Sequence, residues 1–128
     1  MKEEILQQAF ELKKASEEAE KQLEFVNHQI KELEEFGNGI EEFGDIENKE
    51  ILAPIGRGVF IKADRKDEKL FVEVGAGVVI KKDSGEVKEI IDGQIKKFHG
   101  ARGQLREQLQ EYASAFYEML EEVKSIKK

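Results

Sequence analysis

The sequence predicts an α+β fold in which two long helices pair as an antiparallel coiled coil and two β-hairpins join them. Two observations predict this fold. Apolar residues recur in a heptad pattern over about 40 residues at each end of the chain. Between these segments, residues 51–82 form the only β-like stretch, rich in Val and Ile and interrupted by glycines. We therefore divide one domain into a first helix (1–44), a two-hairpin segment (45–83) and a second helix (84–128).

The composition is typical of long helices. The chain has 128 residues, of which 38% are charged, with one proline and no cysteine or tryptophan. The lack of cysteine excludes a disulfide framework and a thiolate metal site. No apolar run approaches the ~20 residues of a membrane span, and the first residues lack the apolar core of a signal peptide. We expect a soluble, cytoplasmic protein with no membrane partner.

Charge is unevenly distributed along the chain. The net charge is −7, made up of −9 over residues 1–50, +2 over residues 51–83 and zero over residues 84–128. An acidic first helix would repel a phosphate backbone, so we expect no nucleic-acid binding. Solvated helix faces account for most of these charges.

The first helix carries an unbroken heptad seam. Its positions alternate by four and three residues, and nine of the eleven are apolar: Ile5, Ala9, Leu12, Ser16, Ala19, Leu23, Val26, Ile30, Leu33, Gly37 and Ile40. A repeat sustained this long predicts a coiled coil. We place the helix end near Phe43, with Gly44 as its C-terminal cap and a polar connector over residues 45–50.

The middle segment reads as two hairpins of the same form, each an apolar strand, a Gly-x-Gly turn and a second apolar strand. The strands are Ile51–Ile55, Val59–Ala63, Leu70–Val74 and Val78–Lys81. Pro54 lacks an N–H and predicts an edge strand or a bulge. Isolated hairpins are marginally stable, and exposed strand edges pair readily, so we interpret the segment as an oligomerisation platform. Its apolar residues are Ile51, Ile55, Val59, Phe60, Ile61, Leu70, Val72, Val74, Val78 and Ile80.

The second helix begins at Ser84, which we expect to be its N-terminal cap. Its seam is predicted to run through Val87, Ile91, Gln94, Phe98, Ala101, Leu105, Leu109, Tyr112, Phe116, Met119, Val123 and Ile126. Two successive four-residue steps at Ala101–Leu109 predict a stutter. The nearby glycines predict a flexible zone from His99 to Gly103.

Where the chain termini meet, the apolar residues outnumber those that a two-helix seam can bury. We expect a binding patch there, because exposed apolar surface usually marks an interaction site. A wider seam or ordinary fraying of the helix ends is the alternative. The patch comprises Ile5, Leu6, Phe10, Phe116, Tyr117, Met119, Leu120 and Val123.

Nothing in the sequence indicates catalysis. His28 and His99 stand outside any metal-ligand spacing, and hydrolase and metalloprotease motifs are absent. The Gly56-x-Gly58 and Gly75-x-Gly77 turns precede strands, whereas a dinucleotide-binding loop precedes a helix. We predict no catalytic residue, no metal, no cofactor and no enzyme activity.

Two segments carry a family resemblance. Leu52-Ala53-Pro54-Ile55-Gly56-x-Gly58 continuing to Ala63, and Val72-Glu73-Val74-Gly75-Ala76-Gly77 continuing to Lys82, resemble the alpha class of prefoldin subunits, the archaeal type in particular. The resemblance implies a hexamer of two alpha and four beta subunits (α2β4), with hairpins joined into β-barrels. It also implies an ATP-independent holdase that binds unfolded proteins at coiled-coil tips and delivers them to a group II chaperonin.

Two other hypotheses fit the same residues. The chain could be a structural protein whose hairpins pair in an open series, giving a homo-oligomer or filament. It could also be a coiled-coil adaptor with one specific partner. Filament growth that does not change when a beta subunit is added favours the structural protein. A single ligand bound in a fixed ratio favours the adaptor.

Overall fold

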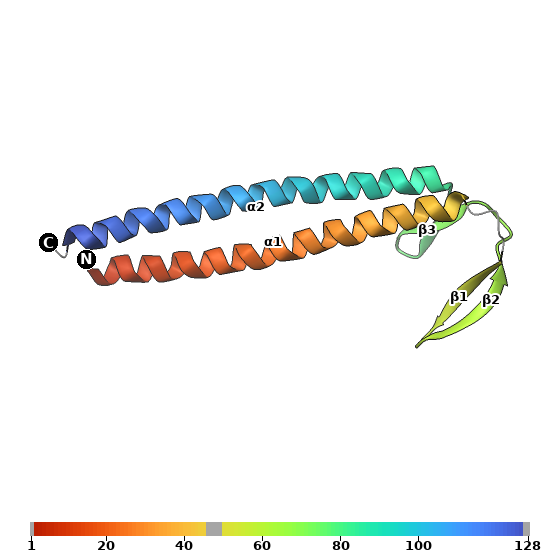
Figure 1. Cartoon of the computed structure of the whole chain (residues 1–128), viewed down its shortest axis with the longest axis horizontal. Helices are drawn as coiled ribbons and strands as arrows, with labels where there is room; N and C mark the ends of the chain where they lie inside the picture. The colour runs from red at the N-terminus through yellow and green to blue at the C-terminus, as the bar shows by residue number, and fades with distance from the viewer. Residues whose placement is uncertain (1, 46–49, 127–128) are drawn as a thin grey trace. The chain divides into compact units, whose positions relative to one another are not determined.

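The predicted order of elements is confirmed in a computed structural model, which describes residues 2–45 and 50–126 (Figure 1). The elements are α1 (Lys2–Asp45), β1 (Glu50–Gly56), β2 (Val59–Asp64), β3 (Leu70–Gly75), β4 (Val78–Lys82) and α2 (Ser84–Ile126). Residues 46–49 of the expected connector lie outside the described residues. The chain forms two compact units, one of residues 1–32 with 95–128 and one of residues 33–94. Each is described by itself below.

In the first unit, the two helical segments pair antiparallel through the predicted seam. Every predicted seam position of α1 in this unit is half-buried or buried. Its buried centre comprises Ala19, Val26, Ile30 and Leu105, against which pack Leu23, Ile95, Phe98, Ala101, Leu109 and Tyr112. Small residues at Ala9, Ser16 and Ala19 keep the buried volume of the seam low, so its stability depends on the few large residues in this centre.

Part of the seam predicted for α2 is wrong. Gln94 is exposed, and the seam of the first unit includes Ile95 instead. Ile126, the last predicted seam residue, is also exposed. Ala101, Leu105 and Leu109, the positions of the predicted stutter, pack in the seam as expected, and two further four-residue steps join Val87, Ile91 and Ile95. The helix also continues through Gly100 and Gly103 without interruption. A single glycine costs a helix about 1 kcal/mol, which seam burial on neighbouring turns offsets.

In the second unit, glycines let the two helical segments approach closely. A Cβ built on buried Gly37 would lie 3.4 Å from Cγ2 of the buried Ile91. A Cβ on Gly44 would lie 2.6 Å from Oγ of Ser84, which is closer than real Cβ atoms come, and 3.0 Å from Cβ of Ser84, which is a tight contact. Gly44 lies inside the last turn of α1 and has no positive φ. The prediction that Gly44 caps the helix is therefore wrong, because α1 continues through it to Asp45, and close packing against Ser84 explains the residue.

The N-terminal cap of α2 is Asp83 and not Ser84. The Glu86 N–H donates to Asp83 Oδ1 over 2.8 Å, and the Val87 N–H donates to the Asp83 carbonyl over 3.1 Å. An acidic cap satisfies a free N–H group and interacts favourably with the helix dipole. The backbone hydrogen bond from Glu86 lowers the pKa of the Asp83 carboxyl. Ser84 instead lies against Gly44.

The C-terminal end of α1 receives its cation from another part of the chain. The last turn of α1 contains no basic residue. Arg65, from the segment between β2 and β3, donates through Nη1 to the Phe43 carbonyl over 3.1 Å. Its guanidinium carbon lies 4.5 Å from the centre of the Phe43 ring, and its other nitrogens donate to the carbonyls of Asp67 (3.1 Å) and Glu68. Arg65 thus ties the connector between the hairpins to α1.

Both hairpins have the same turn. In each, the strands pair antiparallel, and the register shifts by one residue just before the turn, between Pro54 and Gly56 and between Glu73 and Gly75. The bulge expected next to Pro54 is thus confirmed. The turn residues take positive φ, at Gly56-Arg57-Gly58 (137°, 52°, 78°) and at Gly75-Ala76-Gly77 (117°, 52°, 75°). A two-residue turn with two positive φ angles matches the twist of a hairpin, and glycine tolerates it best.

The hairpins form two separate two-stranded sheets, β1 with β2 and β3 with β4. Large apolar side chains stand exposed on both of them, at Leu52, Ile55, Val59, Phe60, Ile61, Phe71, Val74, Val78 and Val79. Ion pairs at their margins, Lys62–Glu50 (3.4 Å) and Lys81–Asp67 (2.5 Å), involve partly exposed groups and add little stability. The predicted α+β fold is confirmed, and most of the large apolar side chains of both hairpins are exposed in the described part of the chain.

Candidate binding surfaces

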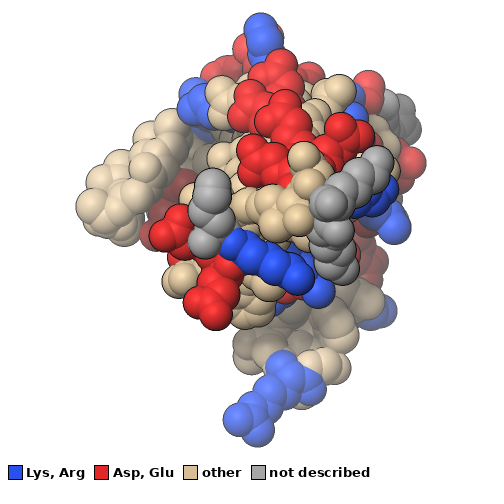
Figure 2. Space-filling view, turned by 90° about the vertical axis from the view of Figure 1, so that its left-hand side faces the viewer, with Lys and Arg blue, Asp and Glu red and all other residues tan. Residues whose placement is uncertain are grey.

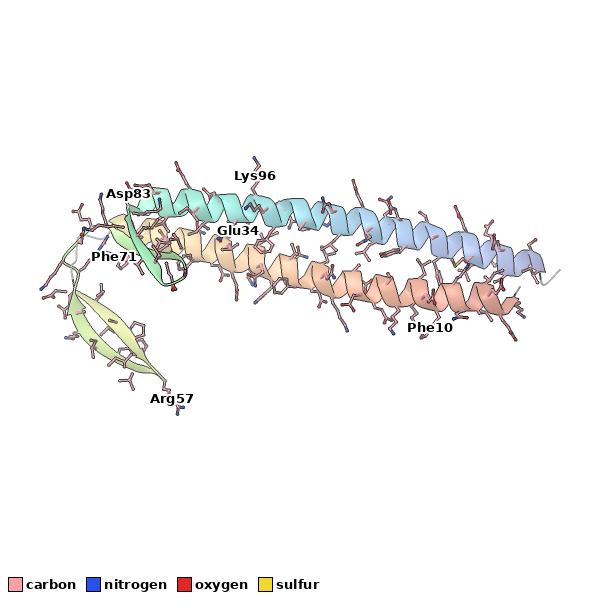
Figure 3. All side chains as sticks on the ribbon, turned by 180° about the vertical axis from the view of Figure 1, so that it is seen from behind. Phe10, Glu34, Arg57, Phe71, Asp83 and Lys96 are labelled. Carbon is pink, nitrogen blue, oxygen red and sulfur yellow. The ribbon has the colours of Figure 1, made fainter. Side chains whose placement is uncertain are left out.

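The predicted apolar patch divides into exposed and half-buried residues. Tyr117 is 72% exposed and Phe10 is 67% exposed, and Leu6 and Leu120 are also exposed. Phe116 is on the border at 36% exposure. Ile5, Met119 and Val123 are half-buried in the seam, where they support the exposed residues. Phe10 lies on the outer side of α1 (Figure 3). The patch is therefore more than a wide seam, although three of its predicted members belong to the seam.

The exposed residues of the patch gather on one side of the first unit. Leu6 and Phe10 each follow a seam residue of α1, and Tyr117 and Leu120 each follow a seam residue of α2. Since successive helical residues are about 100° apart, residues that follow seam positions share one side of an antiparallel helix pair. We call this side, defined by Leu6, Phe10, Phe116, Tyr117 and Leu120, the apolar face.

A shallow groove of about 430 Å³ continues the apolar face between the two helices. We call it the Tyr117 groove. Its lining is Leu12, Lys13, Ser16, Glu17, Glu20, Tyr112, Ala113, Phe116 and Tyr117. The apolar part comes mostly from α2, and the charges come from α1. Such a surface can hold apolar side chains of another polypeptide and offers no enclosed cavity for a small substrate.

The end of the molecule that carries both termini also bears many carboxylates. Figure 2 looks onto this end and shows red acidic side chains next to tan uncharged surface.

Two exposed aromatic residues away from the predicted patch, Phe25 (60% exposed) and Phe36 (56% exposed), were not predicted as surface sites. The signal was available, because both are large apolar residues outside the heptad positions.

The second candidate surface is formed by the hairpins. Of the predicted oligomerisation residues, Ile55, Val59, Phe60, Ile61, Val74 and Val78 are exposed, whereas Ile51, Leu70, Val72 and Ile80 are half-buried. Leu52, Phe71 and Val79 are exposed too and were not predicted. The Phe71 ring lies 5.7 Å from Lys81 Nζ. Arg57 projects at the turn of the first hairpin (Figure 3). These exposed apolar side chains on two small sheets form the second candidate interaction surface.

The shifted pKa values of Asp67 and Lys88 arise from hydrogen bonds at the surface. A hydrogen bond from Lys81 lowers the pKa of Asp67, and a 2.6 Å bond to Glu41 raises the pKa of Lys88. His28 Nε2 lies 3.0 Å from Glu32 Oε1, and Arg102 Nη2 donates a hydrogen bond to Nδ1 of His99, with both pairs on the surface. Among the described residues, no group of three or more His, Asp or Glu could hold a metal. Neither helix, over its described length, is apolar enough to cross a membrane.

Together these features define a coiled-coil subunit that displays assembly hairpins and an apolar face. The model of the family "Prefoldin subunit" matches residues 12–128, and the chain belongs to this family, whose members are non-enzymatic chaperone subunits that assemble with one another. A search of curated proteins found no match. In fold, the chain is similar to filamentous PFD from Methanocaldococcus jannaschii, known from cryo-EM. The identity is 18% and the TM-score 0.75, over 94% of this chain and 98% of that chain.

Proposed function

We propose that this chaperone-type subunit is an ATP-independent holdase that acts in the cytoplasm on unfolded proteins. The apolar face of the first unit carries the proposal. It offers three aromatic rings and two leucines to solvent, beside the Tyr117 groove, whose lining is partly apolar. Burying apolar surface yields about 25 cal/mol per Å², so several such contacts hold an unfolded chain reversibly without a nucleotide.

We further propose that the hairpins assemble the chain with beta-class prefoldin subunits. The exposed apolar residues on both sheets support this, and so do the outer strand edges, which pair with no further strand among the described residues. An α2β4 hexamer and delivery of clients to a group II chaperonin follow from the alpha-class resemblance of the hairpin sequences. Native mass spectrometry after co-expression with a beta-class subunit tests the assembly, and an α2β4 mass is the expected result.

A four-residue variant tests client capture. Leu6→Ser, Phe10→Ser, Tyr117→Ser and Leu120→Ser remove the exposed apolar side chains and leave the seam residues in place. The assembled variant should lose most suppression of client aggregation, measured by light scattering of a chemically unfolded client. A control with Phe36→Ser removes one aromatic ring of similar exposure from the second unit. Full protection by the four-residue variant, at an unchanged oligomeric mass, would refute the assignment of the apolar face.

A second candidate function is self-assembly into filaments. The structural neighbour is described as filamentous, and the two hairpins of this chain share one turn geometry, so one copy could pair with the next in an open series. Electron microscopy of the purified chain with and without a beta-class subunit distinguishes the two functions. Filaments that persist unchanged with the partner present would favour self-assembly, whereas conversion to a closed particle would favour the holdase hexamer.

A further inference from the structure

The side of the first unit opposite the apolar face is acidic. Residues that directly precede a seam position lie on this side of the helix pair. The reason is the same 100° step that places residues following a seam position on the apolar face. From Glu4 to Gln22 of α1 and from Gln104 to Glu122 of α2, these positions hold no Lys or Arg. Six of them are glutamates: Glu4, Glu11, Glu18, Glu111, Glu118 and Glu122. We call these six residues the acidic side.

A groove of about 650 Å³ lies at the inner end of the acidic side. We call it the Phe25 groove, after the aromatic ring that stands 60% exposed in it. Val26, Ala101 and Leu105 add apolar surface, and Gln22, Gln104, Gln108, Glu107 and Glu111 form the polar part of the lining. None of the described residues that line this groove is a lysine or an arginine. It shares no residue with the Tyr117 groove.

The carboxylates of this groove continue along α2. Glu107 and Glu111 also line an adjoining hollow, to which Glu118 belongs as well. None of these three glutamates has an ion-pair partner among the described residues, so their charges face solvent. A segment bound in the groove would thus contact the apolar surface around Phe25 and the glutamine amides beside it. Farther along α2 it would meet the row of glutamates.

We propose that the Phe25 groove binds a polypeptide segment of a protein partner in which an apolar anchor residue stands next to lysines or arginines. The exposed Phe25 ring and the apolar floor take the anchor out of water. Glu107 and Glu111 attract the cations, and an acidic segment is repelled. The three glutamine amides offer donors and acceptors to the backbone of the segment. This site is separate from client capture on the apolar face and does not depend on it.

Fluorescence anisotropy with the full-length chain tests the proposal. One labelled peptide contains leucines interspersed with lysines and serines, and its twin carries glutamate in place of every lysine. The basic peptide should bind, and the acidic twin should bind at least about tenfold more weakly. Binding of the basic peptide should weaken steadily between low and physiological salt, since the charges are exposed. Equal affinities for the two peptides would overturn the proposal.

Matched variants locate the binding. Phe25→Ser should weaken binding of the basic peptide about tenfold, whereas Phe36→Ser, at a similarly exposed ring outside the groove, should leave it unchanged. Glu107→Gln with Glu111→Gln should cost about three- to tenfold, and Glu34→Gln with Glu35→Gln should cost nothing. Circular dichroism verifies that each variant keeps its helices. Wild-type affinity in Phe25→Ser would refute the assignment, and loss of aggregation suppression in that variant would contradict the independence of the two sites.

Discussion

Replacing Gly44 by alanine should stabilise the fold if helix propensity dominates and destabilise it if close packing against Ser84 dominates. In an exposed helix, replacing glycine by alanine stabilises by about 0.5–1 kcal/mol, because alanine restricts the unfolded chain. At Gly44 the new methyl carbon would lie 2.6 Å from Ser84 Oγ and 3.0 Å from Ser84 Cβ. Rotation of the serine can move Oγ, but Cβ moves only with the backbone of α2. Overpacking of this kind costs about 1–3 kcal/mol.

The net expectation for Gly44→Ala is therefore a loss of about 1–2 kcal/mol in the free energy of unfolding. Urea denaturation followed by circular dichroism measures it, at one fixed protein concentration because assembly shifts apparent stability. Gly39→Ala is the matched control, since nothing lies within 4 Å of a Cβ at Gly39, and it should stabilise. The double variant Gly44→Ala with Ser84→Gly should recover most of the loss, because it removes the clashing side chain. Stabilisation by Gly44→Ala alone would refute the packing explanation.

Three further outcomes are expected. Gly100→Ala and Gly103→Ala, which meet no atom within 4 Å, should each raise the free energy of unfolding by about 1 kcal/mol in the same assay. Arg65→Ala should lower the free energy of unfolding by about 1–3 kcal/mol, because the hydrogen bonds from Arg65 to the carbonyls of α1 and of the connector are lost. Arg65→Lys should recover only part of this loss. Equal stability of all three proteins would contradict the role of Arg65 in tying the connector to α1. The pKa of Asp83 is lower in the folded state, so its carboxylate stabilises the fold at pH values above the unfolded-state pKa. This stabilisation is lost as the pH falls through the folded-state pKa. Asp83→Asn should therefore make stability less sensitive to acid, as measured by circular dichroism during an acid titration.

Heptad spacing predicted most of the coiled coil, because burial on a helix pair follows directly from the positions of apolar residues. All eleven predicted positions of α1 are half-buried or buried. Strict four-three alternation places Gln94 in the seam of α2, but the seam departs from that alternation after Ile91 and includes Ile95. Residue type predicts Ile95 correctly, because burying the glutamine amide without hydrogen-bond partners costs free energy and burying isoleucine does not.

Long-range neighbours explain what the sequence could not predict. Gly44 was assigned as a cap from local rules, yet its role depends on Ser84, which is far away in the chain. Arg65 lies in a polar connector and gives no local sign that it reaches the end of α1. The choice of Asp83 over Ser84 as cap depends on one residue of helix register, which propensity rules do not resolve.

The candidate surfaces were predicted in part. An excess of apolar residues near the termini indicated a patch, but the split between exposed Tyr117 and half-buried Met119 required the positions of both helices. The separation of an apolar face from an acidic side was readable from the residues before and after each seam position. The Phe25 groove was not, because it depends on which residues of α2 lie opposite Gln22 and Phe25.

Site-specific photocrosslinking tests the central claim most directly. Benzoylphenylalanine is placed at Phe10, at Tyr117 or, as a control, at Phe36, and the assembled complex is irradiated with an unfolded, weakly charged client. Crosslinks should form at Phe10 and Tyr117 and be absent or weak at Phe36, because only the first two lie on the apolar face. Crosslinks of equal strength at all three positions, or none at Phe10 and Tyr117 while the complex still protects the client, would contradict capture by this face.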